Sequence, residues 1–290
     1  MKIIDFFKKK KSLNYQYVHI ILNDKFSLPF IEFMNKNFDN KKQCFVYFMI
    51  SNTKFEIPTK YKNVFVIDKF EDLKIDTKEL QKIFLHSLPN RSVAPYLFQN
   101  QHLLPYCYWI TWGYDLYSTV PDSDEAMFVK KNVKAVITNF DKDVYHKKYN
   151  PDKKILSLPF YPSVIKKEFL DNAVKKNKDY ITVQINNSAE PLTVEMLEIL
   201  SKFSSENINI TTILSYAKTQ CAEEIIKKGE KLFGDKFNAI TEYMTPEKYA
   251  EHLKNTDILI LNQNRQQGVG NIRCNLYLGN KVFIKEEITT

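Results

Sequence analysis

The sequence predicts an α/β protein built from two consecutive blocks in which strands alternate with helices. Short apolar runs typical of buried strands, such as residues 17–22 and 180–185, are separated by amphipathic stretches with the helical period. The alternation pauses at the proline-containing segment 157–163 and a lysine-rich stretch, and then restarts. Because parallel strands need crossover connections, this order favours parallel sheets with helices on their faces. We expect one domain over residues 1–165 and a second over residues 178–290.

Each block contains enough strands for a Rossmann-like sheet. In the first block the expected strands are residues 17–22, 44–50, 63–67, 82–86, 106–111 and 134–138, with a helix over 27–38. In the second block the expected strands are residues 180–185, 208–214, 239–243, 257–261 and 281–284. Its expected helices are residues 191–203, 221–233, 246–254 and 268–278.

The composition is that of a globular protein. Hydrophobic residues make up 44% and charged residues 26% of the 290, and no apolar run approaches the ~18–20 residues needed to span a bilayer. The N-terminal MKIIDFFKKKK places apolar residues before the lysines, the reverse of a secretory signal, so we expect a cytoplasmic protein. The four cysteines are scattered without CxxC spacing, which predicts reduced thiols and neither a zinc site nor a disulfide framework.

The net charge of +8 is unevenly distributed along the chain. Residues 1–177 carry 29 Lys and Arg against 19 Asp and Glu, whereas residues 178–290 carry 13 against 15. This excess predicts that the first domain meets something anionic, either nucleic acid or a membrane surface. The alternative is that the lysine runs are simply solvated. Nucleic acid is supported by charge alone, since the chain has no recognisable nucleic-acid motif and only three arginines.

The scarcest residues of the chain gather after an apolar strand near the C-terminus. Only six glycines are present, and two of them, Gly268 and Gly270, lie one residue apart just after Arg265. Glycines that open a helix let a phosphate approach the free N–H groups and the positive dipole end of that helix. The guanidinium of Arg265 can hold a diphosphate with two hydrogen bonds, and Gln266 and Gln267 can bond sugar hydroxyls. The alternative is a tight turn with a surface arginine.

Two long motifs resemble a known family. Asn264-Arg-Gln-Gln-Gly-Val-Gly-Asn271 is similar to the RQQGxG signature of the TDP-N-acetylfucosamine:lipid II N-acetylfucosaminyltransferases, and Trp109-Ile-Thr-Trp-Gly-Tyr-Asp-Leu-Tyr117 resembles their W-x-x-W-G-x-D-L-Y. A third stretch, Val183-Gln-Ile-Asn-Asn-Ser188, is similar to a V-G-N-S turn, with Asn186 where the family usually has glycine. The resemblance covers nearly the whole chain. It implies a GT-B fold, in which two Rossmann-like domains face a cleft, and a metal-independent hexosyltransferase without a cofactor.

The resemblance places acceptor-side and catalytic candidates in the first domain. Trp112 offers a flat face to a sugar ring, Gly113 permits a tight bend, and Asp115 can orient the acceptor hydroxyl or act as a general base. The alternative is that both tryptophans of the motif belong to the core and Asp115 caps a helix. His86, at a strand end, can bond the acceptor or the donor phosphate, or be structural. Asp24, after the first strand, can hold a polar group of the acceptor or cap the next helix.

Further donor-binding candidates lie in the second domain. Asn187 and Ser188 follow its first strand and can donate hydrogen bonds to a diphosphate, or form a plain turn with an N-cap. Glu242 and Tyr243 end the expected strand 239–243, in a region that lies near the nucleotide base in GT-B enzymes. Tyr243 can stack on the thymine base. The alternative is that Glu242 and Tyr243 are simply surface residues at the end of the strand.

No metal site is expected. Asp122-Ser-Asp124 and Asp141-Lys-Asp143 have the letters of a DxD pair, but both lie in polar segments of the kind found at the surface. In GT-B enzymes the leaving diphosphate is usually neutralised by basic side chains and a helix N-terminus, a role that suits Arg265 and the helix beginning at Gly268.

The predicted function is glycosyl transfer at a membrane. An amino-deoxysugar, with N-acetylfucosamine as the leading candidate, would pass from a TDP-sugar to a polyprenyl-diphosphate-linked glycan in bacterial surface polysaccharide synthesis, such as enterobacterial common antigen or O-antigen. The protein would lie peripherally on the inner face of the inner membrane, where anionic lipids attract basic residues. The expected membrane contacts are Phe6, Phe7, Lys8–Lys11, Lys41 and Lys42.

An alternative function follows from the length of the second block. A GT-B chain normally continues beyond a strand such as 281–284 with further strand–helix units, so we expect a second domain that is C-terminally truncated. This feature favours a catalytically inactive nucleotide-sugar-binding or scaffold protein of a glycan assembly complex. Turnover of the donor separates the two functions.

Overall fold

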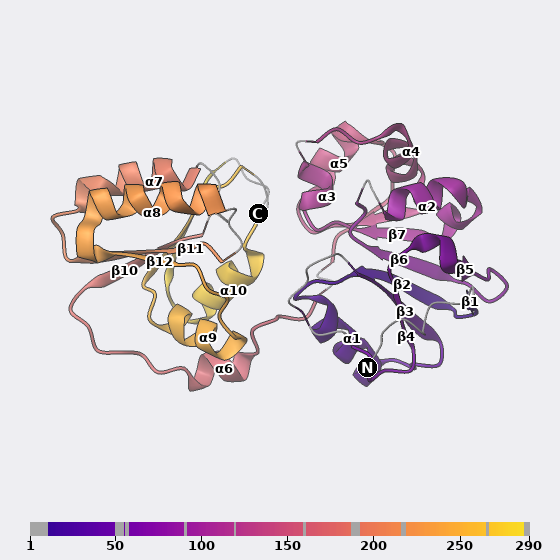
Figure 1. The fold of residues 1–290 in the computed structure, drawn as a ribbon, viewed down its shortest axis with the longest axis horizontal. Coiled ribbons are helices and arrows are strands. Elements are labelled where there is room, and N and C mark those ends of the chain that lie inside the picture. Colours follow the sequence, from indigo (N-terminus) through magenta and orange to yellow (C-terminus); the bar gives the residue numbers. More distant parts are fainter. Residues whose placement is uncertain are drawn as a thin grey trace. The chain divides into compact units, whose positions relative to one another are not determined.

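The chain forms two compact α/β units, residues 1–162 (unit 1) and 163–290 (unit 2). The computed structural model describes residues 11–49, 55, 58–89, 92–118, 120–158, 161–186, 192–215, 219–264 and 267–286. Each unit is a parallel sheet with helices on its faces (Figure 1), which confirms the predicted fold class. Within the described residues, no helix is both long and apolar enough to cross a bilayer.

Unit 1 contains a seven-stranded parallel sheet in the order β4-β3-β2-β6-β7-β8-β9. Its strands are β2 (Tyr17–Leu22), β3 (Gln43–Phe48), β4 (Val64–Ile67), β6 (Lys82–His86), β7 (Cys107–Ile110), β8 (Ala135–Ile137) and β9 (Ile155–Leu156). Its helices are α1 (Ser27–Asn37), α2 (Val93–Gln99), α3 (Tyr114–Tyr117), α4 (Asp124–Asn132) and α5 (Lys142–Lys148), with 3-10 turns η2 (Phe70–Asp72) and η3 (Gln101–Tyr106). A separate parallel pair, β1 (Lys11–Leu13) and β5 (Leu73–Ile75), was not predicted, because each strand is short and includes polar residues, so that it forms no apolar run.

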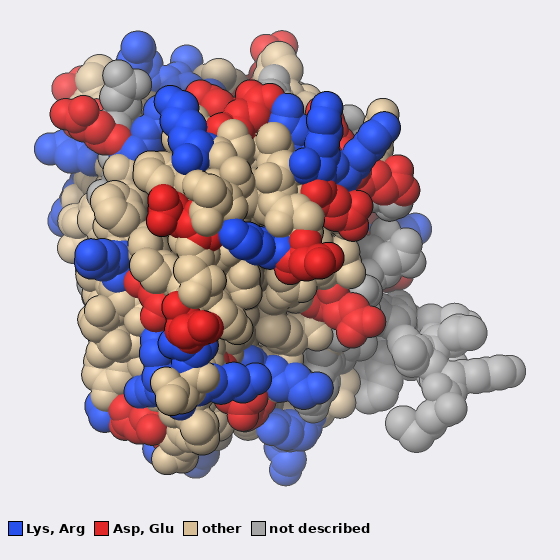
Figure 2. Space-filling view, turned by 90° about the vertical axis from the view of Figure 1, so that its left-hand side faces the viewer, with Lys and Arg blue, Asp and Glu red and all other residues tan. Residues whose placement is uncertain are grey.

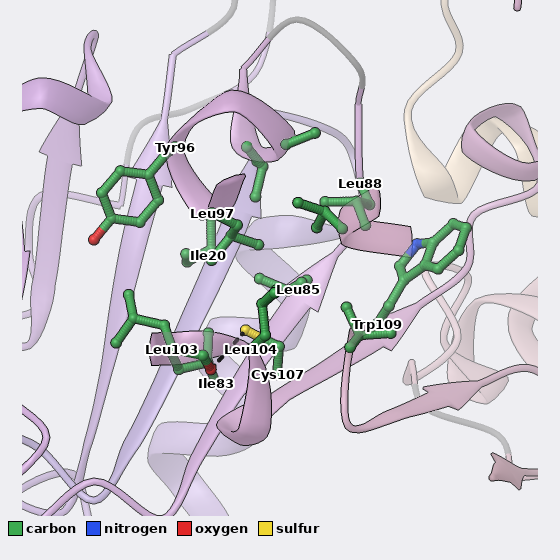
Figure 3. Close-up of a cluster of buried hydrophobic side chains, with 14 of the residues drawn as sticks. Ile20, Ile83, Leu85, Leu88, Tyr96, Leu97, Leu103, Leu104, Cys107 and Trp109 are labelled. Atoms are coloured by element: carbon green, nitrogen blue, oxygen red, sulfur yellow. Dashed lines mark hydrogen bonds between the residues drawn. The ribbon is translucent and has the colours of Figure 1, made fainter. Parts of the chain in front are cut away.

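Unit 1 has an apolar layer on each face of its sheet, since successive side chains of a strand point to opposite faces. Ile20 and Val46 belong to the layer that includes α2, α4 and α5, whereas Ile21 and Phe45 belong to the layer under α1. Figure 1 shows α1 on one side of the sheet and α2 and α4 on the other. The larger layer gathers side chains of β2, β6, β7 and α2 (Figure 3) and buries Trp109 completely.

Unit 2 contains a five-stranded parallel sheet in the order β12-β11-β10-β13-β14. Its strands are β10 (Ile181–Ile185), β11 (Ile208–Ile213), β12 (Phe237–Ile240), β13 (Ile258–Leu261) and β14 (Lys281–Ile284). Its helices are α6 (Lys167–Asn172), α7 (Leu192–Leu200), α8 (Thr219–Phe233), α9 (Pro246–Lys254) and α10 (Val269–Tyr277), with 3-10 turns η4 (Ser201–Phe203) and η5 (Gly234–Lys236). Strand β12 lies two to three residues earlier than predicted, because its register is set by pairing Phe237 with Ile210 of β11.

Helices cover both faces of the unit 2 sheet. On one face α7 and α8 pack through Leu197, Ile225 and Phe233. On the other, Leu170 of α6 is buried with Leu253 of α9 and Cys274 of α10. Part of the lysine-rich stretch before β10 is therefore a packed helix of unit 2.

Both sheets contain one point at which the strand order reverses, and such points hold ligands in open α/β proteins. In unit 1 the reversal lies between β2 and β6, and in unit 2 between β10 and β13. Asp24 and His86 lie at the carboxyl ends of the first pair of strands. Asn186 and Gly268 lie in the loops that follow the second pair.

Candidate functional site

In unit 1, polar and aromatic side chains gather at the carboxyl ends of β2, β6 and β7. The hydroxyl oxygen of Tyr161 accepts a hydrogen bond from Nε1 of Trp112 at 2.7 Å and forms a second hydrogen bond with Nδ1 of His86. Phe26 packs edge-on against Trp112, with 6.0 Å between the ring centroids. Residues from four distant parts of the sequence thus meet at one edge of the sheet. Tyr161 was not predicted, because it follows a two-residue strand in a proline-containing segment that carries no motif.

His86 is fully buried and uses both ring nitrogens inside the protein. Nδ1 bonds Tyr161, and Nε2 lies 3.0 Å from Nδ1 of His19. Burial lowers the pKa of His86 well below its usual value, with a further contribution from His19, and lowers the pKa of His19 to about 3. Both rings are therefore neutral at neutral pH. With both nitrogens engaged, His86 is placed to orient Tyr161, and its influence on a ligand would pass through that residue.

The one ring nitrogen of His19 and His86 that has no hydrogen-bond partner among the described residues indicates which of their nitrogens carry protons. His19 is stacked between Phe45 and Phe84, and its Nε2 has no hydrogen-bond partner among the described residues. A buried N–H without a partner is rarer than an unused acceptor, which favours placing the His19 proton on Nδ1. His19 then donates to Nε2 of His86, and His86 donates from Nδ1 to Tyr161. In this assignment the Tyr161 oxygen accepts two hydrogen bonds.

Asp115 is buried, and its carboxylate accepts three hydrogen bonds. Oδ2 accepts from Nε1 of Trp109 at 2.6 Å and from the backbone N–H of Leu88 at 2.9 Å. Oδ1 accepts from the backbone N–H of Trp112 at 3.0 Å. Gly113, with φ of 82°, makes the bend that brings α3 back over these donors. Trp109 is thus part of the core, and the Asp115 carboxylate is suited to holding the backbone of Trp112 in position.

Asp24 is half-buried at the carboxyl end of β2. One carboxylate oxygen accepts from the backbone N–H of Phe26 at 3.2 Å, in the turn before α1. The N-cap of α1 is Phe26, and no described side chain caps this helix, so Asp24 is not its cap. Burial raises the pKa of Asp24, although the Phe26 hydrogen bond and the charge of Lys25 act in the opposite direction. A partly open carboxyl group with a raised pKa at a switch point is the kind of group that serves as a general base.

The prediction that both Asp-x-Asp segments are exposed was wrong for their leading aspartates. The Asp122 side chain is fully buried and pairs with the equally buried Lys130 at 2.7 Å. Asp141 is buried and accepts from Tyr117 at 2.6 Å and from Thr138 at 3.1 Å. Both leading aspartates are therefore held by hydrogen bonds inside unit 1. In the part of the chain that the structure describes, no group of His, Cys, Asp and Glu is arranged to hold a metal ion.

In unit 2 the loops after β10 and β13 meet at the start of α10. Asn186, which follows β10, accepts a hydrogen bond from Nδ2 of Asn271 in α10 at 2.9 Å. Gly268 precedes the helix with a left-handed φ of 67°, and a Cβ there would lie 2.6 Å from Nδ2 of Asn186. Only glycine fits at position 268 without a shift of its neighbours. The asparagine that departs from the family turn is thus packed directly against this glycine.

Gly270 has different surroundings. It is exposed in the first turn of α10, and a Cβ added there would meet nothing within 4 Å. Packing within the protein does not require glycine at this position, so its small size leaves open space beside the helix start.

Two glutamines near the same loop carry buried amide atoms without partners. Both side-chain polar atoms of Gln263 and Oε1 of Gln267 have no hydrogen-bond partner among the described residues. Such atoms cost about 1–3 kcal/mol each when left unpaired, and a ligand or water that bonds them removes this cost. Gln267 was a predicted sugar-binding residue. Gln263 was not predicted, because its neighbours Asn262 and Asn264 are equally polar and nothing distinguishes it in sequence.

The remaining predicted donor residues are either outside the described chain or away from the switch point. Asn187, Ser188, Arg265 and Gln266 lie outside the described residues. Glu242 and Tyr243 are exposed after β12, the edge strand, with β11 between it and β10.

Solved structures share the architecture of this chain at low sequence identity. A glycosyltransferase from Rickettsia africae ESF-5 matches with a TM-score of 0.66 and 8% identity, over 95% of this chain and 80% of that one. A UDP-forming alpha,alpha-trehalose-phosphate synthase from Burkholderia xenovorans matches at 0.61 and 10%, over 95% and 85%. UDP-GlcNAc 2-epimerase from Neisseria meningitidis bound to UDP-GlcNAc matches at 0.53 and 11%, over 92% and 82%. These similarities show the GT-B fold.

Sequence comparison identifies the family. No curated protein sequence matches the chain. The model of a glycosyltransferase family matches residues 31–286, a range that includes the tryptophan motif, the glycine-containing turn and the switch point of unit 2, and that begins after β2 and Asp24 of unit 1. This chain therefore belongs to the 4-alpha-L-fucosyltransferase family, glycosyl transferase group 56, and is a glycosyltransferase.

Proposed function

We propose that the protein transfers an amino-deoxysugar, with N-acetylfucosamine as the leading candidate, from a TDP-sugar to a polyprenyl-diphosphate-linked glycan. The observation that carries the proposal is the unit 2 switch point, where a helix start, a glycine without room for a side chain and unpartnered buried amides lie together. Free N–H groups at a helix start bind phosphate oxygens, and Arg265 adds a charge beside them in sequence. The Neisseria epimerase of the same fold binds UDP-GlcNAc, which supports a sugar nucleotide as the ligand.

The proposed reaction is a displacement at the anomeric carbon of the donor sugar. The acceptor hydroxyl oxygen forms the new bond to this carbon, the bond to the diphosphate oxygen breaks, and TDP leaves with the electron pair. Asp24 takes the proton of the hydroxyl group. Trp112, held by Asp115 and Tyr161, presents its ring to the acceptor sugar. The start of α10 and Arg265 stabilise the charge that develops on the leaving diphosphate.

The acceptor places the proposed reaction at the inner face of the inner membrane, in the synthesis of surface glycans such as enterobacterial common antigen or O-antigen. The positive excess of residues 1–177 supports this location. Each basic residue close to an anionic membrane contributes about 1 kcal/mol of attraction. The resemblance of the two long motifs supports the donor and acceptor classes.

Calorimetric titration with TDP and UDP tests the donor site directly. Arg265→Ala should weaken TDP binding about 10- to 100-fold, because a charge-assisted hydrogen bond contributes about 1.5–3 kcal/mol. Arg273→Ala is the matched control, since Arg273 is exposed on α10 and has no assigned role, and its TDP affinity should stay at the wild-type value. Absence of TDP and UDP binding by the wild-type protein would contradict the proposal.

Release of TDP from TDP-N-acetylfucosamine in the presence of a lipid-linked acceptor tests the transfer itself. The proposal expects release that depends on the acceptor. A protein that binds the TDP-sugar tightly and never releases TDP would instead be a binding or scaffold component.

A further inference from the structure

We infer that the last turns of α1 and the loops beside them form a surface that docks on anionic membranes. We call it the α1 surface, and it comprises seven exposed residues: Phe33, Lys36, Phe38, Lys41, Lys42, Lys60 and Lys62. The inference rests on the proposed function for the identity of the membrane-borne acceptor, but the docking step is measurable without any glycosyl transfer.

Three segments of the chain are fastened together to make this surface. Nδ2 of Asn63 donates to Oδ1 of Asn35 in α1 at 2.9 Å and to the backbone oxygen of Gln43 at 3.2 Å. Nζ of Lys60 lies 3.0 Å from a carboxylate oxygen of Glu32. The loop at 58–62 is therefore held against α1 and against the start of β3, where Lys41 and Lys42 lie.

The charge of the α1 surface is one-sided. Its segments contain five lysines and two acidic residues, Glu32 and Asp39. Glu32 pairs with Lys60, and Asp39 accepts from the backbone N–H of Lys41 at 2.9 Å. The other four lysines form no ion pair with a described residue. By contrast, the face of the molecule in Figure 2 shows basic and acidic side chains interspersed. A one-sided basic surface complements the negative potential of anionic lipids.

Two exposed aromatic side chains distinguish this surface from a merely solvated lysine run. Phe33 is 43% exposed and Phe38 is 56% exposed. The core does not need them, because Phe30 and Ile31 already fill the space between α1 and the sheet. Lysines flanking exposed phenylalanines are typical of helices that lie in the interface of a bilayer. This combination favours a membrane over a purely electrostatic partner such as nucleic acid.

The position of the α1 surface also constrains the acceptor. α1 starts beside Asp24 and runs for 11 residues, so its far end lies about 16 Å along the helix axis from the proposed base. An acceptor hydroxyl that reaches Asp24 while its lipid stays in the bilayer must stand off from the membrane. One or more sugars between the diphosphate and the reacting hydroxyl supply that distance.

Co-sedimentation with vesicles tests the surface. We expect the whole chain to bind phosphatidylglycerol–phosphatidylethanolamine vesicles at low salt and to bind phosphatidylcholine vesicles weakly. Phe33→Ser with Phe38→Ser, and Lys41→Glu with Lys42→Glu, should each lower binding about tenfold. The matched controls lie in unit 2: Phe203→Ser, at a side chain 52% exposed, and Lys227→Glu with Lys231→Glu on the exposed face of α8. These controls should bind as the wild type does.

Several outcomes would overturn the inference. Wild-type vesicle binding by both α1 double variants would assign docking elsewhere in the chain. Loss of binding in the lysine variant alone, matched by loss of binding to duplex DNA, would point to nucleic acid.

Sugar transfer to a water-soluble acceptor should be unchanged in the α1 variants. Absence of transfer by a protein that still docks on vesicles would count against the proposed function and not against the surface.

Discussion

Two aspartates of unit 1, Asp115 and Asp24, differ in burial and in hydrogen-bond donors. These differences suit them to the different roles that we propose. Asp115 is buried with three N–H donors on its oxygens, whereas Asp24 is half-buried and accepts from backbone N–H groups of the turn before α1. Sequence alone offered Asp115 as a general base and Asp24 as a residue that contacts the acceptor or caps a helix, because each follows a strand end. Only the donors that surround Asp115 in the folded chain distinguish it from Asp24, and they support the positioning role that we propose for it.

Replacing Asp24 tests the reactive role. Asp24→Asn should lower kcat about 10²- to 10⁴-fold, the usual contribution of a general base, and leave TDP affinity unchanged, since the nucleotide is assigned to unit 2. The raised pKa of Asp24 means that wild-type activity falls as the pH drops through that pKa, because the base must be deprotonated. A pH profile of kcat/KM should lose this acidic limb in the variant. Persistence of the limb would show that another group titrates.

Replacing Asp115 tests the positioning role. Asp115→Asn turns one accepting oxygen into an N–H₂ group that faces an existing N–H donor, so the free energy of unfolding should fall by about 1–3 kcal/mol. Urea unfolding followed by tryptophan fluorescence measures it, since Trp109 lies in the affected cluster. Asp24→Asn is the control and should change stability by less than about 0.5 kcal/mol. Equal losses in the two variants would contradict the assignment.

At the scale of elements, the presence of an apolar run, and not length alone, decided what could be predicted. Six strands of the large unit 1 sheet and all five of unit 2 show in the sequence as apolar runs, and the helix after the glycine turn was placed within one residue. Strands β1, β5 and β9 have two or three residues and carry no pattern. The site followed the same division. Gly268 and the tryptophan motif are visible as local patterns, whereas the bond between His86 and Tyr161 joins residues 75 positions apart and depends on sheet order.

The start of α10 offers a test at this scale with two nearby glycines. Gly268→Ala should destabilise unit 2 by about 1–3 kcal/mol, because the left-handed backbone and the contact with Asn186 both oppose a side chain. Gly270→Ala lies in open space within the helix and should be neutral or stabilise by up to about 1 kcal/mol. Urea unfolding distinguishes them.

Nucleotide binding by the second of these variants locates the diphosphate. If the diphosphate lies against the helix start, the added methyl group of Gly270→Ala should weaken TDP binding although the protein is no less stable. Wild-type affinity in Gly270→Ala would place the diphosphate elsewhere. Calorimetric titration of both variants with TDP makes the measurement.

At the scale of the whole molecule, each unit holds a histidine whose pKa burial lowers, and these side chains contribute to the response to acid. Burial lowers the pKa of His19 in unit 1 to about 3 and that of His252 in unit 2 to about 4. In the unfolded chain both pKa values are about 6.5. Between these limits the unfolded state binds protons that the folded state does not. The contribution of these histidines to the free energy of unfolding is therefore fully present above about pH 6.5. Below that pH the free energy of unfolding falls by up to about 1.4 kcal/mol per pH unit for each histidine.

Urea unfolding at pH 7.5, 6 and 5 measures this acid dependence. His252→Gln keeps a hydrogen-bond donor toward Gln184, which His252 now contacts at 2.9 Å, and should flatten the pH dependence of unit 2. His102→Gln is the control, because His102 is exposed, and should leave the dependence as it is. An unchanged slope in His252→Gln would contradict the role assigned to this side chain.

The reversed strand order also dictates the sequence in which the two sites come into existence on the ribosome. The unit 1 site is complete once Tyr161 has emerged, before any strand of unit 2 is made. The unit 2 site cannot form until β13 and the start of α10 have joined β10, which is made some 75 residues earlier. A sugar nucleotide stabilises only a folded site. It therefore gives no help to the nascent chain until after Gly268 has been synthesised, and the earlier residues of unit 2 must be protected from aggregation without their ligand.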